Sequence, residues 1–148
     1  MIAQAKIDSL SELIREVGRK MREIHREIPG MPLKPMALLF LKFVAEKKNP
    51  TMKELADQFS ITPPSVTGLI DSLVAERYLL RDFDRDDRRL IRLSITEKGR
   101  QTLKKCLQLA RKGMAAILGQ MDEAEIDNLY SGLNHLLKII KINKYGKN

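Results

Sequence analysis

Arginine and aspartate side chains are clustered between positions 84 and 92, in a pattern that suits contact with a polyanion. The segment Asp84-Arg-Asp-Asp-Arg-Arg89 is charged throughout, and Arg92 follows it. Guanidinium groups bind phosphate oxygens and enter narrow minor grooves, where negative potential is concentrated. We therefore expect Arg88 and Arg89 to enter a minor groove and Arg85 to contact a phosphate. The alternative is an exposed charge cluster that only keeps a turn soluble.

A second set of candidate contacts precedes this cluster. Ser65 and Thr67 carry hydroxyl groups for base edges or phosphates, and Pro64 or the Thr67 methyl can touch a thymine methyl. Gly68 has no side chain at a central position, so discrimination between DNA sequences is expected to depend more on DNA shape and on the arginines. For Ser65 the alternative role is the hydrogen bonding that starts a helix.

Two short helices and a tight turn are predicted to position these hydroxyl groups. The pattern Thr51-Met-Lys-Glu54 is a capping box, which places a helix start at Met52. Ser60-Ile61 breaks the helical pattern, after which Thr62 is a natural N-cap and Pro63 suits the first position of a second helix. The second helix is typical of a recognition helix that enters a major groove. Its inward stripe is expected to contain Val66, Leu69, Ile70 and Leu73.

The charged cluster is predicted to form the tip of a β-hairpin. Two runs of β-forming residues, 78–83 and 90–95, flank it. A helix-turn-helix followed by a hairpin is a winged helix, in which the hairpin tip reaches the neighbouring backbone or minor groove. Arg92, at the foot of the tip, is expected to brace the hairpin or to support a backbone contact.

This hairpin resembles the wing of the MarR (multiple antibiotic resistance regulator) family of transcriptional regulators. Asp87-Arg-Arg89-Leu-Ile-Arg92 matches the family signature D-x-R-x-x-R, and Leu93-Ser-Ile-Thr96-Glu-Lys-Gly99 is similar to its continuation L-x-L-T-x-x-G. The resemblance implies that Arg89 contacts DNA and that Asp87 orients it through a local salt bridge. The family pattern often has proline where this chain has Arg85 and arginine where it has Gly68.

Long amphipathic helices are expected at both ends of the chain. Apolar residues recur three and four apart from Ile7 to Ile28, and this narrow stripe is too long to serve one winged helix. Thr96 is a candidate N-cap for another long helix, and Asp122-Glu-Ala-Glu125 resembles a capping box that begins a last one. We therefore predict a homodimer, although a single amphipathic helix on its own domain is the alternative for residues 7–28.

The predicted fold is mainly α with a small β-hairpin wing, in a single domain over residues 1–148. Its DNA-binding region spans 33–96, and its helical dimerisation region combines 1–30 with 97–142. The nearly continuous apolar run from Met36 to Val44 is expected to be a buried helix at the centre of the winged helix. Residues 143–148 are polar and expected to fray.

Composition narrows the function further. A net charge of +8 and a pI near 9.7 favour a polyanionic partner, with a solvated basic surface as the alternative. No apolar run reaches the ~18–20 residues of a membrane span, and no signal-peptide pattern begins the chain, so a cytoplasmic location is expected. The single cysteine, Cys106, is expected to be a buried, inert thiol.

Metal and catalytic chemistry find no support in the motifs. The aspartates of the charged cluster lack the glycine and distal glutamate of a calcium loop, and His25 and His135 are far apart for a zinc site. Phosphate-binding glycine loops, H-E-x-x-H and G-x-S-x-G are missing from the sequence. We therefore expect neither an enzyme nor a cofactor.

The sequence thus predicts a homodimeric DNA-binding transcriptional regulator that reads a pseudo-palindromic operator in double-stranded DNA. The resemblance implies a repressor that a small aromatic or phenolic effector releases from DNA. Candidate effector contacts are His25, Met36 and Phe40, although Met and Phe at helical spacing are more often core residues. The alternative functions are an architectural or weakly sequence-specific DNA-binding protein, favoured by Gly68 and the basic charge, and a protein-binding winged helix.

Overall fold

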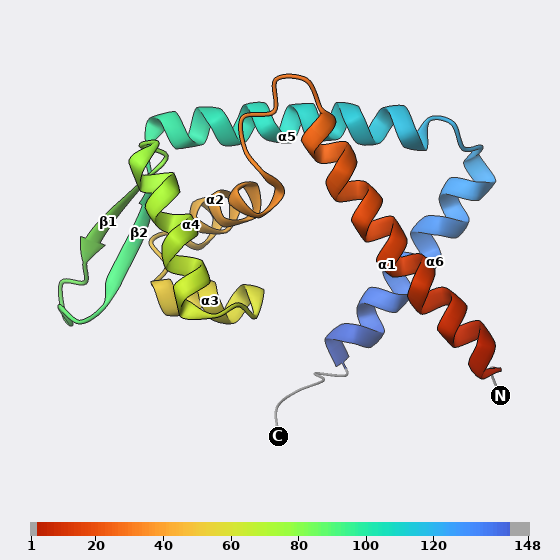
Figure 1. Ribbon diagram of the computed structural model, residues 1–148, viewed down its shortest axis with the longest axis horizontal. Helices are drawn as coiled ribbons and strands as arrows, with labels where there is room; N and C mark the ends of the chain where they lie inside the picture. Colours follow the sequence, from red (N-terminus) through yellow and green to blue (C-terminus); the bar gives the residue numbers. More distant parts are fainter. Residues whose placement is uncertain (1–2, 143–148) are drawn as a thin grey trace. The chain divides into compact units, whose positions relative to one another are not determined.

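A β-hairpin and the helices around it make up the first of two compact units, which ends at Ala110 (Figure 1). The computed structural model describes residues 3–142, so the fraying predicted for residues 143–148 lies outside the described residues. The predicted fold class, mainly helical with one hairpin, is confirmed. The elements in chain order are α1 (Gln4–Glu27), α2 (Pro35–Lys47), α3 (Met52–Phe59), α4 (Pro63–Ala75), β1 (Leu79–Phe83), β2 (Ile91–Ile95), α5 (Glu97–Leu118) and α6 (Glu123–Ile142).

Helix α2 is the buried centre of the first unit, as its apolar run predicts. Phe40 and Leu41 are fully buried, and the Phe40 ring lies 5.0 Å from the ring of Phe59 in α3. Met36 and Leu39 are the exceptions, because they lie on the face of α2 that stays exposed. The core around α2 draws on every other element of the winged helix and includes Leu33, Val44, Leu55, Val66, Ile70, Leu73, Leu79, Leu93 and Leu103.

The helix-turn-helix forms where the predicted N-caps place it, but one of these caps bonds differently from the prediction. The Glu54 amide donates to Thr51 Oγ1 at 3.1 Å, and the Thr51 amide donates to Glu54 Oε2 at 2.7 Å, which completes the capping box. Helix α3 then ends at Phe59, and its C-cap Ser60 has a left-handed φ of 51°. Thr62 occupies the N-cap position of α4, but in the described chain its side chain caps no backbone amide. Its hydroxyl oxygen lies 3.0 Å from that of Ser65 instead.

The predicted hairpin is present as an antiparallel pair. Leu79 lies opposite Ile95 and Phe83 lies opposite Ile91, and Leu79 and Leu93 are fully buried under the hairpin. An isolated bridge between Thr51 and Arg92 joins β2 to the start of α3, where the sequence shows no evident strand. The hairpin is therefore held both by its core-facing side chains and by the segment that precedes α3.

A glycine secures the foot of the wing to α5. Thr96 caps this helix as predicted, because its Oγ1 accepts from the Gly99 amide at 2.9 Å. The same hydroxyl donates to the Arg77 carbonyl at 2.7 Å, which ties the cap to the end of α4. A Cβ atom added at Gly99 would lie 2.2 Å from the Tyr78 carbonyl oxygen. Only glycine fits this position without a shift of the backbone.

The long helices leave apolar side chains exposed on the single chain. In α1 the exposed apolar residues are Ile7, Leu10, Leu13, Ile14 and Val17, while Met21 and Ile24, and Ile28 just after the helix, are half-buried. In the second unit, the predicted capping box starts α6, with hydrogen bonds of 2.9 and 2.8 Å between Asp122 and Glu125. Within the described part of the chain, no residue of α6 is buried and no helix is long and apolar enough to cross a membrane.

Candidate nucleic-acid interface

The N-terminal end of α4 and the turn of the hairpin lie at the same edge of the first unit (Figure 1). Ser65, at the start of α4, and Arg89, in the turn, are both exposed there. The structure therefore brings together the two sets of residues predicted as DNA contacts. All members of these sets except Asp87 and Arg92, which are half-buried, are exposed: Pro64, Ser65, Thr67, Gly68, Arg85, Arg88 and Arg89.

The exposed face of α4 offers small groups. Thr67 Oγ1 donates to the Pro63 carbonyl at 3.0 Å, so its hydrogen is used within the helix, while its oxygen lone pairs can still accept a hydrogen bond. The Ser65 hydroxyl is shared with Thr62. At Gly68, no described atom beyond the adjacent residues and the nearby backbone of α4 itself lies within 4 Å of the position that a Cβ would occupy. Helix α4 contains no lysine or arginine, so the cationic part of the interface is supplied by the wing.

Asp84 organises the turn of the wing, a role that the sequence analysis missed. Its Oδ1 accepts hydrogen bonds from the amides of Asp86 at 2.9 Å and Asp87 at 3.0 Å, and its Oδ2 accepts from Arg92 Nε. The Arg92 guanidinium, and then the two amides, lower the pKa of the Asp84 carboxyl to about 2. In turns, an aspartate side chain often accepts hydrogen bonds from the backbone amides two and three residues further along the chain. The aspartate at position 84 is therefore a sequence signal for this turn.

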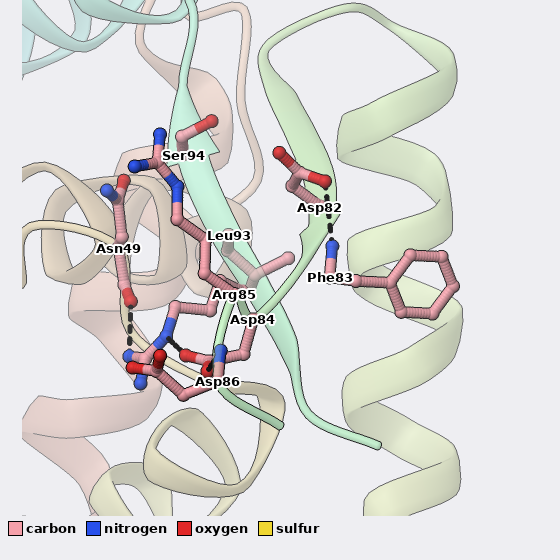
Figure 2. Close-up of a pocket in the computed structure, with 9 residues that line it drawn as sticks. Asn49, Asp82, Phe83, Asp84, Arg85, Asp86, Leu93 and Ser94 are labelled. Carbon is pink, nitrogen blue, oxygen red and sulfur yellow. Dashed lines mark hydrogen bonds and ion pairs between the residues drawn. The ribbon is translucent and has the colours of Figure 1, made fainter. Parts of the chain in front are cut away.

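Arg92 braces the hairpin, as predicted. Besides its pairing with Asp84, its Nη1 donates to the Asn49 carbonyl at 3.0 Å. Figure 2 shows these contacts beside a cleft of about 370 Å³. The brace joins the wing to the segment between α2 and α3, which fixes the wing relative to the helix-turn-helix. The cleft is lined by Asn49, Asp82, Phe83, Asp84, Arg85, Asp86, Arg92, Leu93 and Ser94.

The salt bridge implied for Asp87 and Arg89 is present. Arg89 Nε and Nη2 donate to the two carboxylate oxygens of Asp87 at 3.0 and 3.1 Å. These bonds lower the pKa of the Asp87 carboxyl. Asp87 occupies one edge of the guanidinium, while the Arg89 side chain as a whole is 90% exposed. Asp87 therefore holds the guanidinium in one orientation and leaves its other edge exposed, as a contact to a phosphate or a groove would require.

A further ion pair connects the wing to the recognition helix. Arg81 Nη1 of β1 lies 2.5 Å from Asp71 Oδ1 of α4. The two residues are ten positions apart in sequence, at places that neither motif includes, and the sequence analysis did not predict their contact. The pair holds β1 against α4 and so helps to set the separation between the two parts of the interface.

The candidate effector residues do not share one environment. Phe40 is fully buried and its ring packs at a tilt against that of Phe59, so it belongs to the core. His25 Nε2 lies 3.0 Å from the Leu33 carbonyl oxygen, and Met36 is exposed. Cys106 is buried as predicted, and burial raises the pKa of its thiol. Among residues 3–142, no group of three or more His, Cys, Asp or Glu side chains is placed to hold a metal ion.

A helix-turn-helix, a braced hairpin and arginines at its tip define a winged helix DNA-binding protein. The sequence model of the MarR family matches residues 31–90, which contain the helix-turn-helix and most of the wing. This match covers fewer than half of the 148 residues and shows that this part of the chain is similar to MarR-family proteins. The similar proteins are named as transcriptional regulators, and the winged helix of this chain is a fold that such regulators use to bind DNA.

Two known proteins are similar to this chain over most of its length. The HTH-type transcriptional repressor YetL of Bacillus subtilis is 23% identical, over 87% of this chain and 79% of YetL. The transcriptional regulator BldR of Sulfolobus solfataricus is 27% identical, with a TM-score of 0.77 and coverage of 95% of this chain and 100% of BldR.

Two further structures share the fold at lower identity. A mutant of MarR from E. coli, complexed with operator DNA, has a TM-score of 0.77 at 20% identity, over 93% of this chain and 99% of the other. Bordetella bronchiseptica BpsR, described in terms of the regulation of its DNA binding by 6-hydroxynicotinic acid, has a TM-score of 0.73 at 19% identity, over 86% of this chain and 98% of the other.

Proposed function

We propose that this chain is a homodimeric repressor that reads a pseudo-palindromic operator with α4 and the wing. The observation that carries the proposal is Arg89, which Asp87 holds in an exposed position at the same edge as the start of α4. In the proposed complex α4 enters a major groove, where Ser65 and Thr67 meet base edges or phosphates. Arg89 enters the adjacent minor groove.

The other wing residues have supporting roles in this proposal. Arg85 and Arg88 are exposed beside Arg89 and contact phosphates or the minor groove. Arg92 and Asp84 keep the turn in its bound shape, so little conformational entropy is lost on binding. The regulator acts in the cytoplasm, beside the DNA that it reads.

The homodimer is proposed from the exposed apolar surface of the long helices. Five apolar residues of α1 between Ile7 and Val17 are exposed on the single chain, and so are Leu129, Leu133, Leu137 and Ile140 of α6. Such stripes are costly in water and are typical of an interface between subunits. Residues 1–30 and 97–142 would form the dimerisation region, and residues 33–96 the DNA-binding region. Two copies of α4 then meet half-sites about 10 base pairs apart.

Repression and release by an effector are proposed from two similar proteins. YetL is a repressor, and the DNA binding of BpsR is regulated by a small aromatic acid. A small aromatic or phenolic ligand is the corresponding effector class for this chain. His25 and Met36, near the junction of α1 and α2, are its proposed contacts. Phe40 is less suitable, because its ring is fully buried.

An architectural or weakly sequence-specific DNA-binding role is the second candidate. It is favoured by α4, which has no cationic side chain and exposes Gly68 at the centre of its face. Such a surface offers no bidentate contact to a base, and bidentate contacts provide much of direct readout. In this case the wing would supply most of the affinity and little of the specificity.

Selection of DNA by the purified protein separates the two candidates. DNA retained from a random-sequence pool is sequenced, and the recovered duplex competes against random duplex at one salt concentration. A specific regulator recovers an inverted repeat and prefers it by ~10³ or more. Recovery of no common sequence, with equal competition by random DNA, supports the architectural role. No salt-dependent binding to any duplex would contradict both.

A further inference from the structure

The two faces of the hairpin differ in what they meet. Alternate residues of a strand share a face, so Leu79, Arg81 and Phe83 of β1 lie on one side. Leu79 is buried in the core, and Arg81 pairs with Asp71 of α4 at 2.5 Å. This side of the hairpin is therefore turned toward α4. Phe83 is the next residue along it toward the tip, opposite Ile91 of β2.

Phe83 is an exposed aromatic residue within a charged wing. Its side chain is 65% exposed, and Figure 2 shows its ring pointing away from the charged side chains of Asp84 and Arg85. Ile91, its cross-strand neighbour, is also exposed. The opposite face of β1 carries Leu80, which is exposed to a similar extent, 57%. Phe83 and Leu80 are thus similarly exposed apolar residues on opposite faces of the hairpin, and Phe83 is the one on the side of α4.

The geometry of DNA determines what the Phe83 side of the hairpin meets. In the proposed complex α4 occupies a major groove and the wing tip occupies the adjacent minor groove. One sugar-phosphate strand separates these grooves, and it passes between α4 and the wing. We propose that Phe83, supported by Ile91, packs against the deoxyribose rings of this strand at the edge of the minor groove. This inference rests on the proposed function.

The proposed contact differs in kind from the arginine contacts. A phenyl ring against the C–H groups of deoxyribose removes apolar surface from water and releases no counterions. Its contribution should not depend on salt. An arginine on a phosphate instead releases condensed counterions, so its contribution falls as salt rises. Phe83 would therefore supply affinity that persists at high salt, which compensates for the lack of cationic groups on α4.

The test measures affinity against salt for four single variants by fluorescence anisotropy. The probe is a labelled duplex recovered by selection with the parental protein. Phe83→Ala should bind about tenfold more weakly, which corresponds to about 1.4 kcal/mol, with the parental dependence of log Kd on log salt. Leu80→Ala, the matched control on the opposite face, should bind like the parent. Arg89→Ala should weaken binding and reduce the salt slope by about 1.

The outcomes distinguish this inference from the proposed function. Parental affinity in Phe83→Ala, with weakened binding in Arg89→Ala, overturns the Phe83 contact and leaves the interface intact. Equal losses in Phe83→Ala and Leu80→Ala also overturn it, because they indicate a general effect on the hairpin. Parental binding by Arg89→Ala contradicts the interface itself. Phe83→Leu keeps an apolar side chain and should retain most of the affinity, while thermal melts verify that each variant folds.

Discussion

Two glycines in helices of the first unit should respond in opposite ways to the same substitution. Gly99 lies in the first turn of α5, where an added Cβ would be 2.2 Å from the Tyr78 carbonyl oxygen and 2.8 Å from Ile95 Cγ1. Gly68 lies in α4, and no described atom beyond the adjacent residues and the helix's own nearby backbone is within 4 Å of the same added atom. Gly99→Ala therefore forces backbone apart, while Gly68→Ala only replaces a poor helix former by a good one.

The structure sets the size of each effect. Overpacking of a well-packed site costs about 1–3 kcal/mol, and the Gly99 clash is with backbone, which cannot move aside as a side-chain end can. We expect Gly99→Ala to lower the free energy of unfolding by about 3 kcal/mol. Gly68→Ala should raise it by about 0.5–1 kcal/mol, because alanine loses less conformational freedom in a helix. For a chain of this length these changes correspond to about 9 °C and about 2–3 °C in Tm.

The assay is urea and thermal unfolding followed by circular dichroism, at one protein concentration because a dimer couples stability to concentration. A Gly99→Ala protein as stable as the parent would refute the predicted clash between residue 99 and the Tyr78 carbonyl at the foot of the wing. A destabilised Gly68→Ala protein would refute the reasoning at α4, since that would mean that the position is packed and not open to a DNA surface.

Three further predictions concern the wing and the long helices. Arg89→Ala should lower affinity for selected and random duplexes by about tenfold, with an unchanged Tm, in titrations at matched salt. The control variant Arg100→Ala, on α5, should bind both duplexes like the parent. Asp84→Asn should flatten the acid side of the stability profile: the folded pKa of about 2 lies below the ordinary 3.8, so Asp84 stabilises the fold above about pH 4 and this contribution disappears as the pH falls toward 2. Identical acid unfolding of the two proteins would contradict that role. Ile14→Glu, on the exposed apolar stripe of α1, should give monomers in equilibrium sedimentation at micromolar concentration, while Ser11→Glu should remain dimeric. A dimeric Ile14→Glu protein would exclude this stripe from the interface.

Local signals were sufficient to predict most of the elements. Each predicted helix cap joins residues only three positions apart, so it can be recognised from a short stretch of sequence. This holds for the capping boxes at Thr51 and Asp122 and for the cap at Thr96. The salt bridge from Asp87 to Arg89 is equally local, and the resemblance to a family implied it. Thr62 occupies the predicted N-cap position, but its hydroxyl lies beside that of Ser65 and caps no backbone amide in the described chain. A hydroxyl has several partners within reach, so its position in the sequence does not determine which one it bonds.

Contacts between distant residues could not be predicted in the same way. Arg92 reaches the Asn49 carbonyl across forty-three positions, and Arg81 meets Asp71 only because β1 packs beside α4. The sequence did not distinguish core from pocket at Phe40, since an aromatic residue at helical spacing suits both. Similarly, the face on which Phe83 lies follows from the hairpin register, and a shift by one residue would have reversed it.

The central claim is that α4 and the wing of each subunit bind one half-site of a symmetric duplex. Hydroxyl-radical footprinting of the selected duplex tests it most directly, because the radical cuts deoxyribose at the minor-groove edge. We predict two protected blocks related by a dyad, and we predict that Arg89→Ala loses the minor-groove protection in both blocks while it still binds at raised protein concentration. A single unrepeated block, or the same footprint with and without the Arg89 side chain, would contradict the account.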